Sequence, residues 1–119
     1  MGKKVFIVED SPELLEVIEA ALRQEGFEVA GQETGRNAVV KIKETMPDVI
    51  LLDVILPCMD GHAIASQLSQ DDTTKKIPIV VITALVQSKS LFDKFGQVKS
   101  FVTKPFSASE LVSVIKTAV

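Results

Sequence analysis

Charged or hydroxyl side chains follow four of the five short apolar segments in this sequence. In chain order they are Glu9 with Asp10, then Asp53, Thr83 and Lys104. If the segments are strands of one parallel sheet, their carboxyl ends lie along one edge, which is where such sheets bind ligands. Three carboxylates, one hydroxyl and one amine would then meet at a single site.

Three neighbouring carboxylates repel one another. Two unit charges about 4 Å apart cost roughly 4 kcal/mol at an effective dielectric constant of about 20. Lys104 alone supplies too little positive charge to offset this repulsion, whereas a divalent cation would supply two more units. Ligands that are all oxygen favour a hard ion over zinc, so Mg²⁺ is predicted here, with Mn²⁺ as a substitute.

A carboxylate beside Mg²⁺ and a lysine can attack phosphorus and form an acyl phosphate. The metal and the amine of Lys104 would hold the equatorial phosphoryl oxygens, on which charge collects during transfer. The hydroxyl of Thr83 is suited to donate a hydrogen bond to one of the same oxygens. Asp53 is therefore the predicted nucleophile, held at the edge of the core rather than inside it.

The elements that must position these residues follow a repeated strand–helix pattern. Strands are predicted at Val5–Val8, Phe27–Ala30, Val49–Leu52, Ile79–Ile82 and around Phe101–Val102. Most of these segments are continuously apolar, which is typical of strands buried on both faces of a parallel sheet. The sequence therefore predicts an α/β fold, with a single domain over residues 1–119 and five βα units doubly wound around an open sheet.

Local signals predict where several helices begin. Ser11 is a predicted N-cap before a proline in the first turn, Gly61 opens a helix, and Ser107–Glu110 has the pattern of a capping box. Thr34 is predicted to cap the second helix. The polar segment Gln87–Gly96 has little periodicity and is predicted to hold a short helix.

Composition narrows the class of protein. The chain has 119 residues, which suits one domain, and its net charge is −3 with no block of Lys or Arg, which argues against direct binding to nucleic acid. No apolar stretch approaches the roughly 18 residues of a membrane span. The apolar run after the basic N-terminus is too short for a signal peptide, and the single cysteine suits a reducing compartment, so a cytoplasmic location is predicted.

The sequence resembles the receiver domain of bacterial two-component response regulators over its whole length. In chain order, the motifs that carry the resemblance are FIVEDS (Phe6–Ser11), PDVILLDVILPCMDG (Pro47–Gly61), PIVVITAL (Pro78–Leu85) and VTKPF (Val102–Phe106). Each motif is weak alone, but the set in this order is highly specific. The resemblance implies a flavodoxin-like sheet with strand order 2-1-3-4-5.

The resemblance also implies roles for the acidic residues. Asp53 would accept a phosphoryl group from a histidine of a sensor kinase or of a phosphotransfer protein. Asp10 would bind Mg²⁺ directly, Glu9 would do so through water, and the backbone carbonyl of Ile55 would be a further ligand. Such a chain is not an enzyme in the usual sense, because it catalyses only its own phosphorylation and dephosphorylation.

Three further residues match positions that receivers use for signalling. Lys104 would be the lysine of the family motif, with a cis peptide bond to Pro105, and Thr83 and Phe101 would be the switch residues. Phosphorylation would then change a surface formed by the helix predicted within Gln87–Gly96, the fifth strand and the C-terminal helix. This surface would contact a downstream effector domain or protein, and it would allow a homodimer.

Two other functions stay open from the sequence. A Mg²⁺-dependent phosphohydrolase with an aspartyl-phosphate intermediate commonly carries an acid two residues after its nucleophile, where this chain has Ile55. An adaptor that acts without phosphorylation usually lacks the acids or the lysine. Classical nucleotide binding is disfavoured, since neither the dinucleotide nor the P-loop glycine motif is present.

Overall fold

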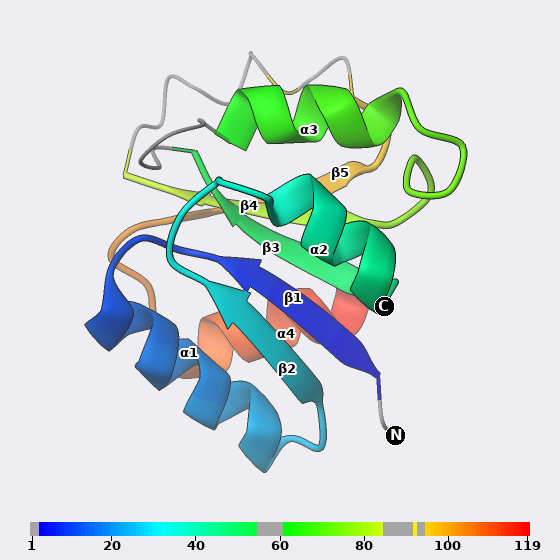
Figure 1. The fold of residues 1–119 in the computed structure, drawn as a ribbon. Helices are drawn as coiled ribbons and strands as arrows, with labels where there is room; N and C mark the ends of the chain where they lie inside the picture. Colours follow the sequence, from blue (N-terminus) through cyan, green and yellow to red (C-terminus); the bar gives the residue numbers. More distant parts are fainter. Residues whose placement is uncertain (1–2, 55–60, 85–91, 93–94) are drawn as a thin grey trace.

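The protein was analysed as a computed structural model that describes residues 3–54, 61–84, 92 and 95–119. Its strands form one sheet in the order β2-β1-β3-β4-β5, and every neighbouring pair is parallel (Figure 1). They are β1 Lys4–Val8, β2 Glu28–Gln32, β3 Val49–Asp53, β4 Ile79–Thr83 and β5 Val98–Thr103. The predicted parallel sheet and its strand order are confirmed.

Helices cover both faces of the sheet. They are α1 Pro12–Gln24, α2 Ala38–Thr45, α3 Gly61–Ser69 and α4 Ala108–Ala118. The pair α1 and α4 lies on one face and the pair α2 and α3 on the other (Figure 1). This is the predicted doubly wound arrangement. Among the described residues, no helix combines the length and apolar character needed to cross a membrane.

The two faces of the sheet explain why the central strands are apolar throughout. Alternate side chains of a strand point to opposite faces. In β3, Ile50 and Leu52 pack with α2 and α3, whereas Val49 and Leu51 pack with α1 and α4. All five residues of β3 and all five of β4 are buried. The strands that bracket the site are therefore anchored from both sides.

The predicted helix starts at Ser11, Gly61 and Ser107 are confirmed, and the one at Thr34 is wrong. The hydroxyl of Ser11 accepts a hydrogen bond from the Leu14 N–H at 3.3 Å, and Ser107 caps α4 in the same way. Thr34 does not cap α2, because its hydroxyl instead accepts from the N–H of Arg36 at 3.2 Å in the preceding turn. The helix begins after Asn37, whose backbone is left-handed with φ 61°.

The ends of the edge strands also differ from the prediction. β2 runs to Gln32 rather than to Ala30, and β5 begins at Val98 with an irregular register opposite Ile79 and Val80. Both are edge strands with polar residues on exposed positions, so the apolar pattern underestimates their length. The short helix predicted within Gln87–Gly96 lies largely outside the described residues.

Candidate functional site

The carboxyl ends of four strands bring the predicted site residues to one edge of the sheet. Glu9 directly follows β1, Asp53 ends β3, Thr83 ends β4, and Lys104 directly follows β5. The strands are in register here, with Asp53 opposite Ile82 on the neighbouring strand. Because all strands are parallel, residues from four distant parts of the sequence converge on one site, as predicted.

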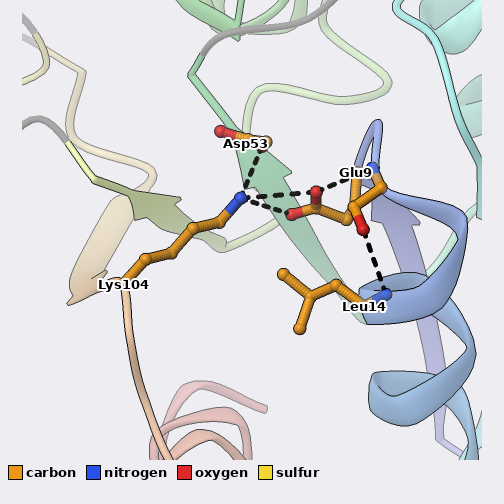
Figure 2. Close-up of polar contacts among 5 residues, drawn as sticks. Glu9, Leu14, Asp53 and Lys104 are labelled. Carbon is orange, nitrogen blue, oxygen red and sulfur yellow. Dashed lines mark hydrogen bonds and ion pairs between the residues drawn. The ribbon is translucent and has the colours of Figure 1, made fainter.

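Lys104 lies between two buried carboxylates, and Figure 2 shows its side chain reaching toward both. Its Nζ is 3.0 Å from Oδ2 of Asp53, 3.0 Å from Oε1 of Glu9 and 3.3 Å from Oε2 of Glu9. Glu9 is fully buried and Asp53 is 4% exposed, so water screens these contacts little. The ammonium group therefore has a well-defined position against the proposed nucleophile.

A backbone hydrogen bond helps to orient the side chain of Lys104. The N–H of Lys104 donates to the carbonyl of Thr83 at 2.8 Å, which ties the end of β5 to the end of β4. The Lys104–Pro105 bond is cis, as predicted from the motif. The hydrogen bond to Thr83 fixes the direction in which the lysine leaves β5, toward Asp53 and Glu9.

The ionisation of the site reflects its burial. Burial raises the pKa of Glu9 from its ordinary value of 4.5 to about 7, against the lowering effects of the Ser11 N–H and the Lys104 ammonium. Burial lowers the pKa of Lys104, but hydrogen bonds to Asp53 and Glu9 outweigh that effect, and the net pKa lies above its ordinary value. Lys104 is therefore charged at neutral pH. The positive charge near Glu9 does not offset the effect of its burial, so the pKa of Glu9 stays raised.

Three carboxylates at the rim fit a hard divalent cation. Glu9, Asp10 and Asp53 each offer one oxygen, and these oxygens lie within 4.8 Å of one another. Oxygens on opposite sides of a Mg²⁺ ion lie about 4.2 Å apart, so only a small adjustment is needed. Oε1 of Glu9 is buried, and its neighbour is the Lys104 ammonium 3.0 Å away; it accepts no further hydrogen bond among the described residues, so it could also face a cation or a water bound to one. Ile55, the predicted carbonyl ligand, lies outside the described residues.

The two predicted switch residues occupy different surroundings. Thr83 is 1% exposed at the end of β4. Phe101 is half-buried on β5, and its ring meets the edge of Phe92 with centroids 5.6 Å apart. Phe92 also contacts the ring of His62 at 5.6 Å, a contact that the sequence motifs did not indicate. The spacing of these residues in the sequence could not predict this ring contact, because the two rings come from separate segments of the chain.

Comparison with known families identified one family model, described as the response regulator receiver domain, which matches residues 5–116. The phosphate regulon transcriptional regulatory protein PhoB of Pseudomonas aeruginosa is 35% identical over 117 residues, covering 98% of this chain and 51% of PhoB. The chemotaxis protein CheY of Thermotoga maritima is 33% identical over 117 residues, covering 97% of this chain and 96% of CheY. The chain therefore spans about half the length of PhoB and nearly all of CheY.

Solved structures resemble the whole chain. The chemotaxis response regulator CheY4 of Vibrio cholerae has a TM-score of 0.92 with 26% sequence identity, covering 100% of both chains. The receiver domain of the sensor histidine kinase PA1611 of Pseudomonas aeruginosa has a TM-score of 0.87 with 29% identity, covering 98% of this chain and 97% of that one. That structure carries a magnesium ion in its active-site cleft.

Proposed function

The chain belongs to the response regulator receiver domain family, whose members are phosphoacceptor signalling modules of two-component systems, and we propose that Asp53 is its phosphoacceptor. The observation that carries this assignment is the Lys104 ammonium, 3.0 Å from the carboxylate of Asp53 at the carboxyl edge of the sheet. A buried carboxylate beside a fixed cation suits attack on an anionic phosphoryl group, because the cation offsets the repulsion between the two anions.

The proposed reaction starts from a phosphohistidine of a sensor kinase or a phosphotransfer protein. A carboxylate oxygen of Asp53 attacks the phosphorus, the P–N bond breaks, and its electron pair leaves on the imidazole nitrogen. Lys104 holds one equatorial oxygen of the phosphoryl group, and the hydroxyl of Thr83 donates a hydrogen bond to another. The product is an acyl phosphate on Asp53.

We assign the Mg²⁺ ligands to Asp10 and Asp53, with Glu9 acting through water and Mn²⁺ as a substitute ion. A bound Mg²⁺ would neutralise the carboxylates and draw charge from the phosphoryl oxygens. Three carboxylates and one ammonium give a net charge of −2 when all four are ionised, which supports a divalent ion over a monovalent one. The backbone carbonyl of Ile55 stays a predicted ligand.

Replacing Asp10 with Asn should weaken Mg²⁺ binding at least ~10-fold, since the change removes one negative ligand while preserving shape. Titration of the protein with Mg²⁺ by calorimetry, without any phosphoryl donor, measures the affinity directly. The matched control is Asp72→Asn, which removes an exposed carboxylate that pairs with Lys75 at 3.0 Å. Asp10→Asn and the control binding Mg²⁺ equally well would show that Asp10 is not a ligand.

The surface beside the site supports a protein as the phosphoryl donor. A hollow of about 420 Å³ borders Lys104, and its other lining residues are Leu14, Ala84, Pro105 and Phe106. Four of its five lining residues are apolar, so the hollow offers little to a small charged donor and more to an apolar side chain of a protein. A kinase could bind here and bring its phosphohistidine to the nucleophile.

Incubation with acetyl phosphate and Mg²⁺, followed by intact-mass measurement, tests the proposed function against its alternatives. A lasting adduct of one phosphoryl group on Asp53 is expected. Turnover of many equivalents without an adduct would indicate a phosphohydrolase. No reaction at all would indicate an adaptor that acts without phosphorylation. We propose that the chain turns over only its own aspartyl phosphate.

Phosphorylation is expected to act through Thr83 and Phe101. A phosphoryl group adds roughly −1.5 to −2 charge and three acceptor oxygens, toward which the Thr83 hydroxyl can move. Phe101 can then turn inward and change its edge contact with Phe92, which biases an equilibrium between two states. Beryllium fluoride, a phosphoryl mimic, should therefore shift the NMR signals around Phe101 and Leu111. Unchanged signals there, in protein saturated with the mimic, would contradict this account.

The partners of the switched surface are proposals as well. We propose that β5, α4 and the segment predicted as a helix within Gln87–Gly96 contact a downstream effector domain or protein, or a second copy of the chain. The relative PhoB is named as a transcriptional regulator, and the chain matches about half of its length. A single domain over residues 1–119, a cytoplasmic location and the lack of direct binding to nucleic acid also stay predictions.

A further inference from the structure

Gly61 lies directly against the backbone of the proposed nucleophile. It is the first residue of α3, it is buried, and its N–H donates to the carbonyl of Val54 at 2.7 Å. A Cβ atom added to Gly61 would lie 2.3 Å from the carbonyl oxygen of Asp53 and 2.9 Å from Cα of Val54. The start of α3 therefore touches the strand end that carries the carboxylate.

Space, rather than backbone conformation, requires glycine at this position. Gly26 has φ +92°, a value that favours glycine, but Gly61 lies outside that region and its backbone suits any residue. The three nearest atoms that a Cβ would meet are backbone atoms of Asp53 and Val54, at the end of β3 and in the residue after it. They cannot rotate away as the tip of a side chain can, so Asp53 or the start of α3 would have to move.

Movement of Asp53 is restricted on the sheet side, because β3 is paired with β1 and β4 on both edges. Relief of the clash would therefore strain the carboxyl end of the strand, which holds the Asp53 carboxylate 3.0 Å from Nζ of Lys104. Hydrogen bonds of this kind have donor–acceptor distances of about 2.7–3.2 Å, so a shift of a few tenths of an ångström would take the contact out of this range.

We propose that Gly61 is a positioning residue, whose lack of a side chain holds the Asp53 carboxylate in reach of Lys104. Gly61 would thus set the position of the nucleophile, in addition to any effect on the stability of the fold. The inference rests on the proposed function for its kinetic consequence, but the geometry it describes can be measured without any phosphoryl donor.

Two other glycines provide matched controls. A Cβ at Gly31 would lie 2.5 Å from Oε2 of Glu19 and 2.9 Å from Cδ1 of Leu15, which are ends of flexible side chains packed on edge strand β2. Gly31→Ala should therefore be accommodated by rotation of these side chains, at a distance from Lys104. A Cβ at Gly96 would meet nothing within 4 Å, so Gly96→Ala should change neither the fold nor the site.

The first measurement is the rate of phosphorylation by acetyl phosphate at saturating Mg²⁺, at a temperature where circular dichroism shows each variant to be folded. Gly61→Ala is expected to react roughly 10 to 100-fold more slowly than the wild type, because misplacement by about 1 Å can cost 10²-fold. Gly31→Ala and Gly96→Ala are expected to react at the wild-type rate, even where urea unfolding shows Gly31→Ala to be less stable. A folded Gly61→Ala that reacts at the wild-type rate would overturn the proposal.

The second measurement uses NMR of the metal-free protein and needs no donor. The ¹³C shift of the Asp53 carboxylate and the ¹⁵N shift of the Lys104 ammonium should change in Gly61→Ala and stay unchanged in both controls. If Gly61→Ala does not fold in plain buffer, trimethylamine N-oxide raises its folded population without removing the clash. A wild type that is not phosphorylated on Asp53 would refute the proposed function, whereas unchanged shifts in Gly61→Ala would refute the positioning role.

Discussion

Replacing Asp53 with Asn is expected to abolish phosphorylation by acetyl phosphate, with a loss of at least ~10³-fold in rate. The amide has nearly the same shape as the carboxylate, but its oxygen is a poor nucleophile and it carries no charge for Lys104 or Mg²⁺ to bind. The variant should stay folded, because the change removes one of two buried carboxylates that repel each other around a single ammonium. Intact mass after incubation with acetyl phosphate and Mg²⁺ measures the loss.

The control for this change lies at the other end of the same strand. Asp48 immediately precedes β3, and its carboxylate accepts a hydrogen bond from the Lys4 N–H at 2.8 Å, far from the carboxyl edge. Asp48→Asn should leave the phosphorylation rate unchanged. If Asp53→Asn still acquired a phosphoryl group at a comparable rate, another residue would have to be the acceptor.

Replacing Lys104 with Met should slow phosphorylation by about 10² to 10³-fold while leaving the nucleophile in place. The methionine keeps most of the apolar stem, but no cation then faces the phosphoryl oxygens on which charge develops. Stability should fall as well, by roughly 2 to 4 kcal/mol. Removal of one partner from a buried ion pair costs about 3–5 kcal/mol, and the side chain of Lys104 is 25% exposed, which reduces that figure.

The stability loss in the lysine variant should depend on pH in a defined direction. The pKa of Glu9 is raised in the folded protein to about 7, so the folded state holds its proton more tightly than the unfolded chain does. The stabilisation from this proton is complete below about pH 4.5 and is lost as the pH rises through about 7. Without the ammonium of Lys104, ionised Glu9 is still more costly, so Lys104→Met should be destabilised more at pH 8 than at pH 5.

Urea unfolding in metal-free buffer at the two pH values measures this difference. The control is Lys116→Met, which removes an exposed partner of Glu25 that connects α4 with the end of α1. Its cost should be about 1 kcal/mol or less, and similar at both pH values. A Lys104→Met variant with equal stability loss at pH 5 and pH 8 would mean that the ammonium does not compensate Glu9.

Much of the fold could be predicted from the sequence, because it depends on local patterns. Helices cover both faces of the sheet, so a central strand has no polar position except at its end. The sequence therefore predicts the buried strands observed at Val49–Asp53 and Ile79–Thr83, in which only the last residue is polar. Parallel connections then force the residues after each strand to one edge. The grouping of Asp53 with Lys104 therefore followed from residue order, although the two lie 51 positions apart.

Residue type alone predicted the ends of helices and strands less well where a turn and a helix compete for the same hydrogen-bonding side chain. Thr34 has the residue type of a helix cap, yet its hydroxyl bonds within a turn and α2 begins later, after Asn37. The edge strands extend beyond their apolar residues, because backbone pairing with one neighbour is sufficient to continue a strand. Such choices depend on the path of the loops, which spacing alone does not encode.

The amino-acid sequence by itself determined which groups reach the edge of the sheet, and the tertiary structure decided how they meet. The sequence could predict an acid at Glu9, but only packing made it fully buried, raised its pKa and placed Lys104 between it and Asp53. Likewise, the sequence could show that Gly61 starts a helix, whereas its contact with the Asp53 carbonyl depends on where α3 lands on β3. Residue order determines which chemical groups reach the site. Their geometry and charge depend on distances of a few ångströms between separate elements, and these distances arise only when the core packs.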